Sequence, residues 1–545
     1  MKKALALMLA AAMILSVTAC GSKPAETKAA AAEAAGAAQT EAATTAAVIE
    51  NQVATKEAAT AAEGETLNYK KDIVIAHHQA PVSRGPQETN TGMQKLIGFM
   101  NFDTLVRFDP ETKQLVGRLA ENYSQEQGGL IWTFNLKKGI RFSNGEELTA
   151  DDCVFTYERA KELGKNTSAW VDCIEKIETP DDYTIIYTLN KANMDFAFQM
   201  TNYCASIMNR EACEADPENG IGIGTGGWII DEFVANDYVK FVRNDDSWVW
   251  EAEGQVNPTE TITIRYMADQ NARMLGVQAG DLDIGCIANN SEFYNYQAQE
   301  GLAPVVAASW SCDYIGMNAN CEYFKDENVR KAVAYAINKD EALEIINNGF
   351  GLTCKSMWCP DTIGYKENFE ENYEYNLDKA KEYLAKSAYP NGFSCKLTTI
   401  SSYSLYAETV QAQLAAIGID CQVDLTDSPG MSEGGKNGTF EMYIWNTTMS
   451  PFGDNLRKLI TSDGASNYAH FANANIDQLM SDAAAEGDEA KRAQLYEQVQ
   501  DELNKDCYLV PMFFGYLSNL TRDNVEGYQF TSEGYYMYNV RAVEK

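Results

Sequence analysis

A strand–helix–strand stretch in the second half of the chain constrains the fold more than any other segment. Residues 393–400 and 419–425 are rich in strand-forming side chains, and residues 403–417 carry apolar side chains at helical spacing. Two strands joined through a helix lie parallel in one sheet, with a right-handed crossover. We therefore expect Cys395 and Cys421 on neighbouring parallel strands. Whether they form a disulfide depends on a Cα–Cα distance below about 7 Å.

The same alternation of strand and helix patterns recurs along the chain. Residues 131–136 alternate as a strand does. A helix is expected to begin after Thr149, an N-cap residue followed by two aspartates that suit the positive end of a helix. Residues 271–279 predict a helix that Gly280 ends, and residues 329–346 predict another amphipathic helix. The chain is therefore expected to adopt a mixed α/β fold.

The N-terminal segment has the pattern of a bacterial export signal. Lys2 and Lys3 precede an apolar run over residues 4–17, which is too short to span a bilayer. The end of this run, Val-Thr-Ala-Cys20-Gly-Ser, resembles the lipobox of bacterial lipoproteins. This resemblance implies a signal peptide over residues 1–19 and a diacylglyceryl group on Cys20 that anchors the protein to a membrane. The alternative is an ordinary signal peptide with an incidental cysteine.

Residues 20–65 are interpreted as a flexible linker. They consist mostly of Ala, Glu and Thr, with no aromatic residue and no leucine. Such a segment cannot bury enough apolar surface to offset its ordering entropy. A transient Ala-rich helix is the alternative, and both are spacers. The remaining residues 66–545 suffice for about three compact units.

Net charge and cysteine content exclude several classes of function. The formal net charge of −34 argues against nucleic-acid binding, which needs a basic surface. Twelve cysteines follow Cys20, and an even number in an exported chain permits disulfides, with buried free thiols as the alternative. Because the chain has no Cys-x-x-Cys sequence and only three histidines, a zinc site of the Cys/His type is not expected. No motif predicts another metal or a cofactor.

The motifs of common enzyme classes are absent from the sequence. Residues 222–227 contain a literal Gly-x-Gly-x-x-Gly sequence, but a dinucleotide site needs a strand before it and a helix after it. Here a polar loop precedes the glycines, and residues 228–233 predict a strand. No Walker lysine motif, His-Glu-x-x-His or Gly-x-Ser-x-Gly sequence occurs. Catalysis is therefore unsupported by the sequence, and no enzyme activity is expected.

Four blocks of sequence resemble family 5 of the extracellular solute-binding proteins, the receptors of peptide, nickel and related ABC importers. The blocks include FDTLVRFDPETKQLVGRLAENYS, GTGGWIIDEFVANDYVKFVRNDDSW, YIGMNANCEYFKDENVRKAVAYAINKDEAL and NYAHFANANIDQLMSDAAAE. They follow the order of the family and extend over nearly all of residues 70–545. Several blocks in one order are more specific than any single motif.

The resemblance implies a two-lobed fold like that of periplasmic binding proteins, in which hinge closure encloses the ligand. Lobe I is expected to comprise residues 66–308 and 514–545, with an extra subdomain near residues 103–215. Lobe II is expected to comprise residues 309–513.

The resemblance also implies candidate ligand-binding residues. Peptide receptors contact ligand with a Pro-Glu-Ser-Asn-like loop, and the similar residues 86–90 make Gln87 and Glu88 candidates. The alternative is a solvated loop. Trp310 lies near the expected crossing between lobes and is a candidate for stacking on ligand, although a core tryptophan has the same pattern. Tyr403 begins a lobe II helix that is expected to face the cleft.

The segment around Trp445 bears on the class of ligand. Peptide receptors commonly place an aspartate three residues after a tryptophan here, where it pairs with the peptide α-ammonium. Counting from Trp445 gives Thr448, and a small shift gives Ser450, neither of which is a carboxylate. Asp454 resembles a later aspartate of the family. A neutral or blocked polar ligand, stacked on aromatic residues such as Trp310 and Trp445, is therefore expected more than a free peptide, unless Glu88 or Asp454 supplies the charge.

The expected function is that of a substrate-binding lipoprotein of an ABC importer. It would capture a peptide or other small polar solute and deliver it to a permease and its ATPase. We expect a monomer, lipid-anchored at Cys20 on the cell surface or the periplasmic side of the cytoplasmic membrane. A surface sensory or adhesion protein and a surface hydrolase with the same fold are the alternatives.

Overall fold

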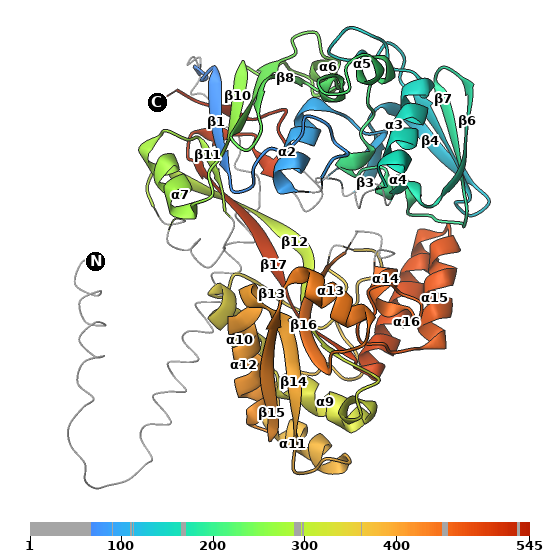
Figure 1. Ribbon diagram of the computed structural model, residues 1–545, viewed down its shortest axis with the longest axis vertical. Helices are drawn as coiled ribbons and strands as arrows, with labels where there is room; N and C mark the ends of the chain where they lie inside the picture. Colours follow the sequence, from blue (N-terminus) through green and yellow to red (C-terminus); the bar gives the residue numbers. More distant parts are fainter. Residues whose placement is uncertain are drawn as a thin grey trace, which may run out of the picture. The chain divides into compact units, whose positions relative to one another are not determined.

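Two long antiparallel strands, β12 (Leu302–Met317) and β17 (Leu509–Arg522), lie side by side in one mixed sheet (Figure 1). The computed structural model describes residues 67–544 except 90, 110, 111, 113, 165–169, 288–295, 297, 298, 361, 450–455 and 531–534, all within one compact unit. Among these residues the sheet has eleven strands. Their order is β15 (Ile419–Thr426), β14 (Phe393–Ile400), β16 (Met442–Thr448), β12, β17, β11 (Ile284–Cys286), β1 (Asp72–His77), β10 (Thr261–Tyr266), β9 (Tyr238–Arg243) and β8 (Trp228–Val234), and β13 (Gly351–Thr353) pairs with β17.

The strands from β11 to β8 lie within the residues predicted to form lobe I, and β1 lies parallel to both β10 and β11 there. Apolar side chains of β1, β9 and β10 pack with those of helix α2 (Gly92–Asn101), and Trp228 is fully buried among them. The other helices of this part are α6 (Val249–Ala252) and α7 (Gln270–Ala279), and its C-terminal strands are β18 (Val525–Glu526), β19 (Gln529–Phe530), β20 (Tyr535–Tyr536) and β21 (Arg541–Ala542).

A second, four-stranded antiparallel sheet in lobe I has its own core. Trp132, Phe134, Tyr187 and Phe196 pack against one another there, with ring centroids 5.4–6.5 Å apart. The elements are β2 (Val106–Asp109), β3 (Gln114–Gly117), β4 (Ala120–Glu126), β5 (Ile131–Leu136), α3 (Ala150–Leu163), β6 (Ile174–Asp181), β7 (Thr184–Leu189), α4 (Phe196–Gln199) and α5 (Arg210–Ala215), of which β4, β5, β7 and β6 form the sheet.

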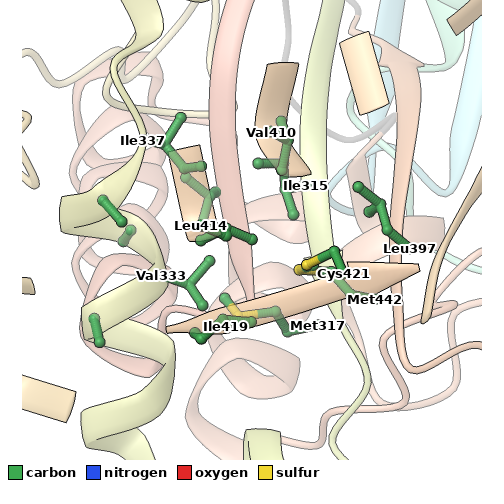
Figure 2. Packing of buried hydrophobic residues seen from close by; sticks show 14 of the residues in the cluster. Ile315, Met317, Val333, Ile337, Leu397, Val410, Leu414, Ile419, Cys421 and Met442 are labelled. Atoms are coloured by element: carbon green, nitrogen blue, oxygen red, sulfur yellow. The ribbon is translucent and has the colours of Figure 1, made fainter. Parts of the chain in front are cut away.

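Lobe II surrounds the other end of the long sheet. Its core is formed by side chains of the central strands and of four helices, including Ile315, Val333, Leu397, Val410 and Leu414 (Figure 2). The helices of this lobe are α9 (Glu327–Ala336), α10 (Lys339–Asn347), α11 (Leu377–Lys386), α12 (Ser404–Ala415), α13 (Ser428–Lys436), α14 (Arg457–Ile460), α15 (Ala474–Ala485) and α16 (Glu489–Asp506). β12 and β17 cross between the lobes without interruption, so the exact lobe boundaries stay predictions.

Most elements expected from the sequence are confirmed. The stretch β14–α12–β15 is a parallel crossover unit, in which Cys395 lies directly opposite Cys421. β5 occupies the expected residues, and α3 follows Thr149, whose backbone N–H donates to the Asp152 carboxylate at 2.9 Å. Gly280 ends α7 with a φ of 85°, a conformation that favours glycine.

The expected single helix over residues 329–346 is wrong in one respect, because the chain forms two helices there. α9 ends at Ala336, and Ile337 is extended. The side chain of Asn338 then accepts the N–H of Glu341 and caps α10. Side-chain caps compete with continued helix, since Asn can satisfy the free N–H groups at a helix start.

Among the described residues, no helix combines the length and the apolar character needed to span a membrane.

The cysteines after Cys20 are free thiols. The Sγ atoms of Cys395 and Cys421 are 3.7 Å apart, and those of Cys312 and Cys354 are also 3.7 Å apart. A disulfide bond needs about 2.05 Å. The two cysteines of each pair are therefore adjacent but not bonded. Most of the cysteines are buried and pack as small apolar side chains.

The glycine-rich loop over residues 222–227 serves packing. β8 follows it, as expected, and the loop lies against the C-terminal end of α2, where Gly226 N–H donates to the Asn101 carbonyl at 3.0 Å. A Cβ atom on Gly224 would lie 1.9 Å from the same carbonyl oxygen. The loop therefore needs glycine for a close approach of two backbones.

Replacing Gly224 with alanine is expected to lower the free energy of unfolding by about 1–3 kcal/mol, because the new methyl group forces the loop and α2 apart. Urea unfolding followed by tryptophan fluorescence measures this change. Gly515→Ala is the matched control, since a Cβ atom there has no neighbour within 4 Å. Equal stability of both variants would contradict this account of the loop.

Candidate ligand-binding site

The order of the strands reverses within lobe II at the neighbouring strands β14 and β16. From β14 the chain passes through α12 to β15 on one side, whereas the next strand, β16, lies on the other side of β14. In α/β sheets, ligands bind outside the carboxyl ends of the strands at such a reversal. The carboxyl ends of β14 and β16 adjoin the place where β12 enters lobe II, because Thr448 pairs with Ser311. This edge is the candidate site.

Three polar side chains meet at this edge. The Tyr403 hydroxyl donates to Asp313 Oδ1 at 3.0 Å and accepts a hydrogen bond from Asn446 Nδ2 at 2.7 Å. Asp313 and Asn446 are paired residues of β12 and β16, and Tyr403 immediately precedes α12. All three are partly buried. The fold thus holds a carboxylate, a phenol and an amide in one fixed cluster.

The Asp313 carboxylate lies in an unfavourable environment for its charge. Burial raises the pKa of Asp313 from its ordinary value of 3.8 to about 7, and the hydrogen bond from Tyr403 opposes this rise. Burial also raises the pKa of Tyr403, with the Asp313 charge as a second cause. At neutral pH the carboxyl group is therefore close to the midpoint of its titration.

The predicted residues of β16 flank this cluster. Thr448 is exposed at the end of the strand, two residues after Asn446 and on the same face of the sheet. Trp445 points to the opposite face, where it packs against the apolar cluster that includes Tyr443 and Phe440. The structure thus brings Tyr403 and Thr448 to one face and places Trp445 on the other.

Trp310 lies on β12 at the crossing between lobes. Its ring meets Phe108 of β2 edge to face, with centroids 5.7 Å apart, and Phe108 meets Phe198 at 6.3 Å in the same way. Only 6% of Trp310 is exposed. The tryptophan therefore joins aromatic residues of lobe I to the crossing strand, and a role in stacking on ligand stays a prediction.

The loop that carries Gln87 and Glu88 is tied to helix α3. Gln87 is fully buried, donating from Nε2 to the Thr156 carbonyl at 2.9 Å and accepting from Arg159 Nη1 at 2.8 Å. Arg159 also forms an ion pair with the half-buried Glu88. The Glu88 charge is thus already compensated within lobe I, while the ligand role of both residues stays a prediction.

The two lobes also touch away from the crossing. The Met194 N–H donates to the Ala484 carbonyl at 3.1 Å, and Arg492 of α16 forms an ion pair with Asp195 at 3.1 Å. Both side chains of this pair are nearly inaccessible to solvent. These contacts hold the segment before α4 against α15 and α16.

Asp313 and Asn446 were missed in the sequence, although one signal was available. Asp313 is the single charged residue in the otherwise apolar run Cys-Asp-Tyr-Ile of a central strand. Burying such a charge costs stability, so a charged residue at this kind of position is a candidate for a functional role. Ser450, Asp454 and Cys20 lie outside the described residues. Within the described part of the chain, no cluster of His, Cys, Asp and Glu has the arrangement of a metal site.

The fold and the location of this site define a two-lobed binding protein. Residues 114–468 match the family described as bacterial extracellular solute-binding proteins, family 5 middle part. This match covers more than half of the chain, so the protein belongs to family 5 of the bacterial extracellular solute-binding proteins.

The chain aligns with individual relatives over most of their length. The chain is 27% identical to the oligopeptide-binding protein AppA of Bacillus subtilis over 76% of this chain and 80% of AppA. It is 25% identical to heme-binding protein A of Haemophilus influenzae over 80% of this chain and 85% of that protein. Among solved structures, the periplasmic binding protein DppA of Helicobacter pylori in complex with the peptide STSA superposes with a TM-score of 0.70, 25% identity, and coverage of 88% and 99%.

Proposed function

We propose that this protein is the substrate-capturing subunit of a bacterial ABC importer and that it binds a peptide or a similar small polar solute. The family match across residues 114–468 carries this proposal. The cluster of Asp313, Tyr403 and Asn446 supports it, since hydrogen-bonding groups lie where an α/β sheet accepts a ligand. Closure of the lobes about β12 and β17 would enclose the solute before its transfer to the permease.

The relatives favour a peptide without excluding other solutes. AppA is named an oligopeptide-binding protein and the DppA structure contains a bound peptide, whereas heme-binding protein A is named for heme. A peptide offers backbone donors and acceptors that match the hydroxyl and amide groups of the cluster. The solute is therefore assigned to the peptide-like polar class.

Capture can be tested with the mature protein. Native mass spectrometry of protein purified from its own cells is expected to show a co-purified small molecule. Thermal-shift screening against di- to pentapeptides is expected to raise the melting temperature with no cleavage product, because a ligand that binds only the folded state stabilises it. Cleavage of the peptides would indicate a hydrolase instead, and the absence of any stabilising solute would contradict solute capture.

The anchor at Cys20 belongs to the same proposal. We expect Cys20→Ser to move the protein from the detergent phase to the aqueous phase in a detergent partition experiment, because two acyl chains hold a protein stably at a membrane and their loss removes that attachment. Cys173→Ser is the control, since this cysteine belongs to the folded part of the chain. Unchanged partition of Cys20→Ser would contradict lipidation.

A further inference from the structure

The partly buried Asp313 carboxylate differs from the buried aspartates elsewhere in the described part of the chain. Asp103 pairs with Arg118 at 2.7 Å, Asp195 with Arg492 at 3.1 Å and Asp283 with Lys70 at 2.6 Å. Asp152 accepts the backbone N–H groups of Thr149 and Arg210 instead. Asp313 receives one hydrogen bond, from the neutral Tyr403 hydroxyl to Oδ1, and among the described residues it has no cationic partner.

The surroundings of Asp313 offer no cation but much aromatic surface. Its neighbours across the two adjacent strands are Asn446 and Phe513. The ring of Tyr406 packs on those of Tyr403 and Phe513, with centroid distances of 6.0 and 5.4 Å, and its buried hydroxyl has no hydrogen-bond partner within the described part of the chain. A carboxylate bordered by apolar rings lies in a medium of low dielectric constant, where an ion pair with an organic cation is stronger than in water.

Asp313 is partly exposed and lies at the edge of the candidate site. It lies two residues after Ser311, whose partner across the sheet is the exposed Thr448 at the end of β16. This is the edge where the strand order of lobe II reverses. A partly buried carboxylate at this edge, without an internal cation, leaves a charge that the fold itself does not compensate.

We propose that Asp313 forms an ion pair with an ammonium or guanidinium group of the bound solute, while Tyr403 and Asn446 position the carboxylate. This assignment rests on the proposed solute-capturing function and adds the charge of the solute to it. It also replaces the neutral or blocked ligand expected from Thr448, since the carboxylate comes from the neighbouring strand and not from β16.

The test compares the parent protein with Asp313→Asn by titration calorimetry at pH 7.5. The probes are the tightest binders from two sets: di- to pentapeptides, each with a free and an N-acetylated form, and the small cations putrescine, agmatine and choline. For the binding probe, the substitution is expected to weaken affinity about 10- to 150-fold, as for a charge-assisted pair. For a peptide whose cationic group is its amino terminus, acetylation of the peptide should weaken its affinity for the parent by the same factor. Acetylation should leave the affinity for Asp313→Asn unchanged.

Asp420→Asn is the matched control. It removes the same charge from the exposed surface of β15, near its amino end, and should leave affinity unchanged. If a solute binds the parent and Asp313→Asn equally well, the ion pair is wrong while solute capture stands. Preferential binding of neutral or anionic solutes by the parent overturns the ion pair in the same way. If no probe binds and no solute co-purifies, the proposed function itself fails and the ion pair with it.

Discussion

Replacing Arg118 with methionine is expected to lower the free energy of unfolding by about 3–5 kcal/mol, because it leaves a buried carboxylate without its cation. Arg118 is 4% exposed, and its guanidinium pairs with Asp103 at 2.7 Å and with Glu253 at 3.2 Å. It also lies 4.6 and 4.8 Å from the ring centroids of Trp248 and Tyr538. Chemical denaturation followed by circular dichroism measures the loss.

Arg107→Met is the control for this prediction. Arg107 pairs with the same Glu253 oxygen at 3.0 Å, but its side chain is 32% exposed, so a loss below about 1 kcal/mol is expected. The double variant Arg118→Met, Asp103→Asn should regain part of the stability, since it removes both charges of the buried pair. Similar losses for the two single arginine variants would show that burial does not determine the strength of these pairs.

At pH 8 the Asp313→Asn variant is expected to be more stable than the parent, by roughly 2–4 kcal/mol. The folded-state pKa of Asp313 is about 7, above its ordinary value of 3.8. Between about pH 4 and pH 7 the folded parent holds a proton that the unfolded chain has lost, so the parent loses stability as pH rises through this range. The amide has no charge to bury and keeps an acceptor for Tyr403.

Urea unfolding of both proteins at pH 4.5 and pH 8 checks this result. The difference in the free energy of unfolding between the two proteins should be small at pH 4.5 and large at pH 8. The titratable groups near Asp313 are Tyr403, Tyr406 and Cys312, and burial raises the pKa of each, away from this range. A difference that does not change with pH would contradict the assignment of the titration to Asp313. A substitution that stabilises the empty protein and weakens solute binding would identify Asp313 as a residue retained for function.

Local patterns predicted the elements of this fold well, because their causes lie within a few residues. The crossover unit β14–α12–β15 follows from periodicity alone. The break between α9 and α10 does not, since both halves have helical spacing. At this break, the Gln413 side chain of α12 accepts a hydrogen bond from the Asn338 backbone N–H at 3.2 Å. The same side chain donates to the Asn338 backbone carbonyl at 3.1 Å, across 75 residues of sequence.

The candidate site was less predictable for the same reason. Tyr403 was recognised, but its partner Asp313 is 90 residues away, and only the pairing of β12 with β16 brings Asn446 to the same place. Glu88 offered a suitable carboxylate in the sequence, and its ion pair with Arg159 lies across 71 residues. Such long-range pairings decide which charges are compensated, and no local pattern reports them.

The irregular pairing of β12 with β17 has a consequence for how solute preference can change. The register shifts between Ala308 and Cys312 and again after Asp313, so the ladder is interrupted where β12 passes from one lobe to the other. Bulges bend a strand and increase its local twist. Trp310 and Asp313 occupy this interrupted stretch, so the residues that would sense a solute also form the mechanical joint. The same segment of β12 would contact the solute and act as the hinge. A substitution there that alters which solute is accepted is therefore expected to alter how readily the lobes open to release it.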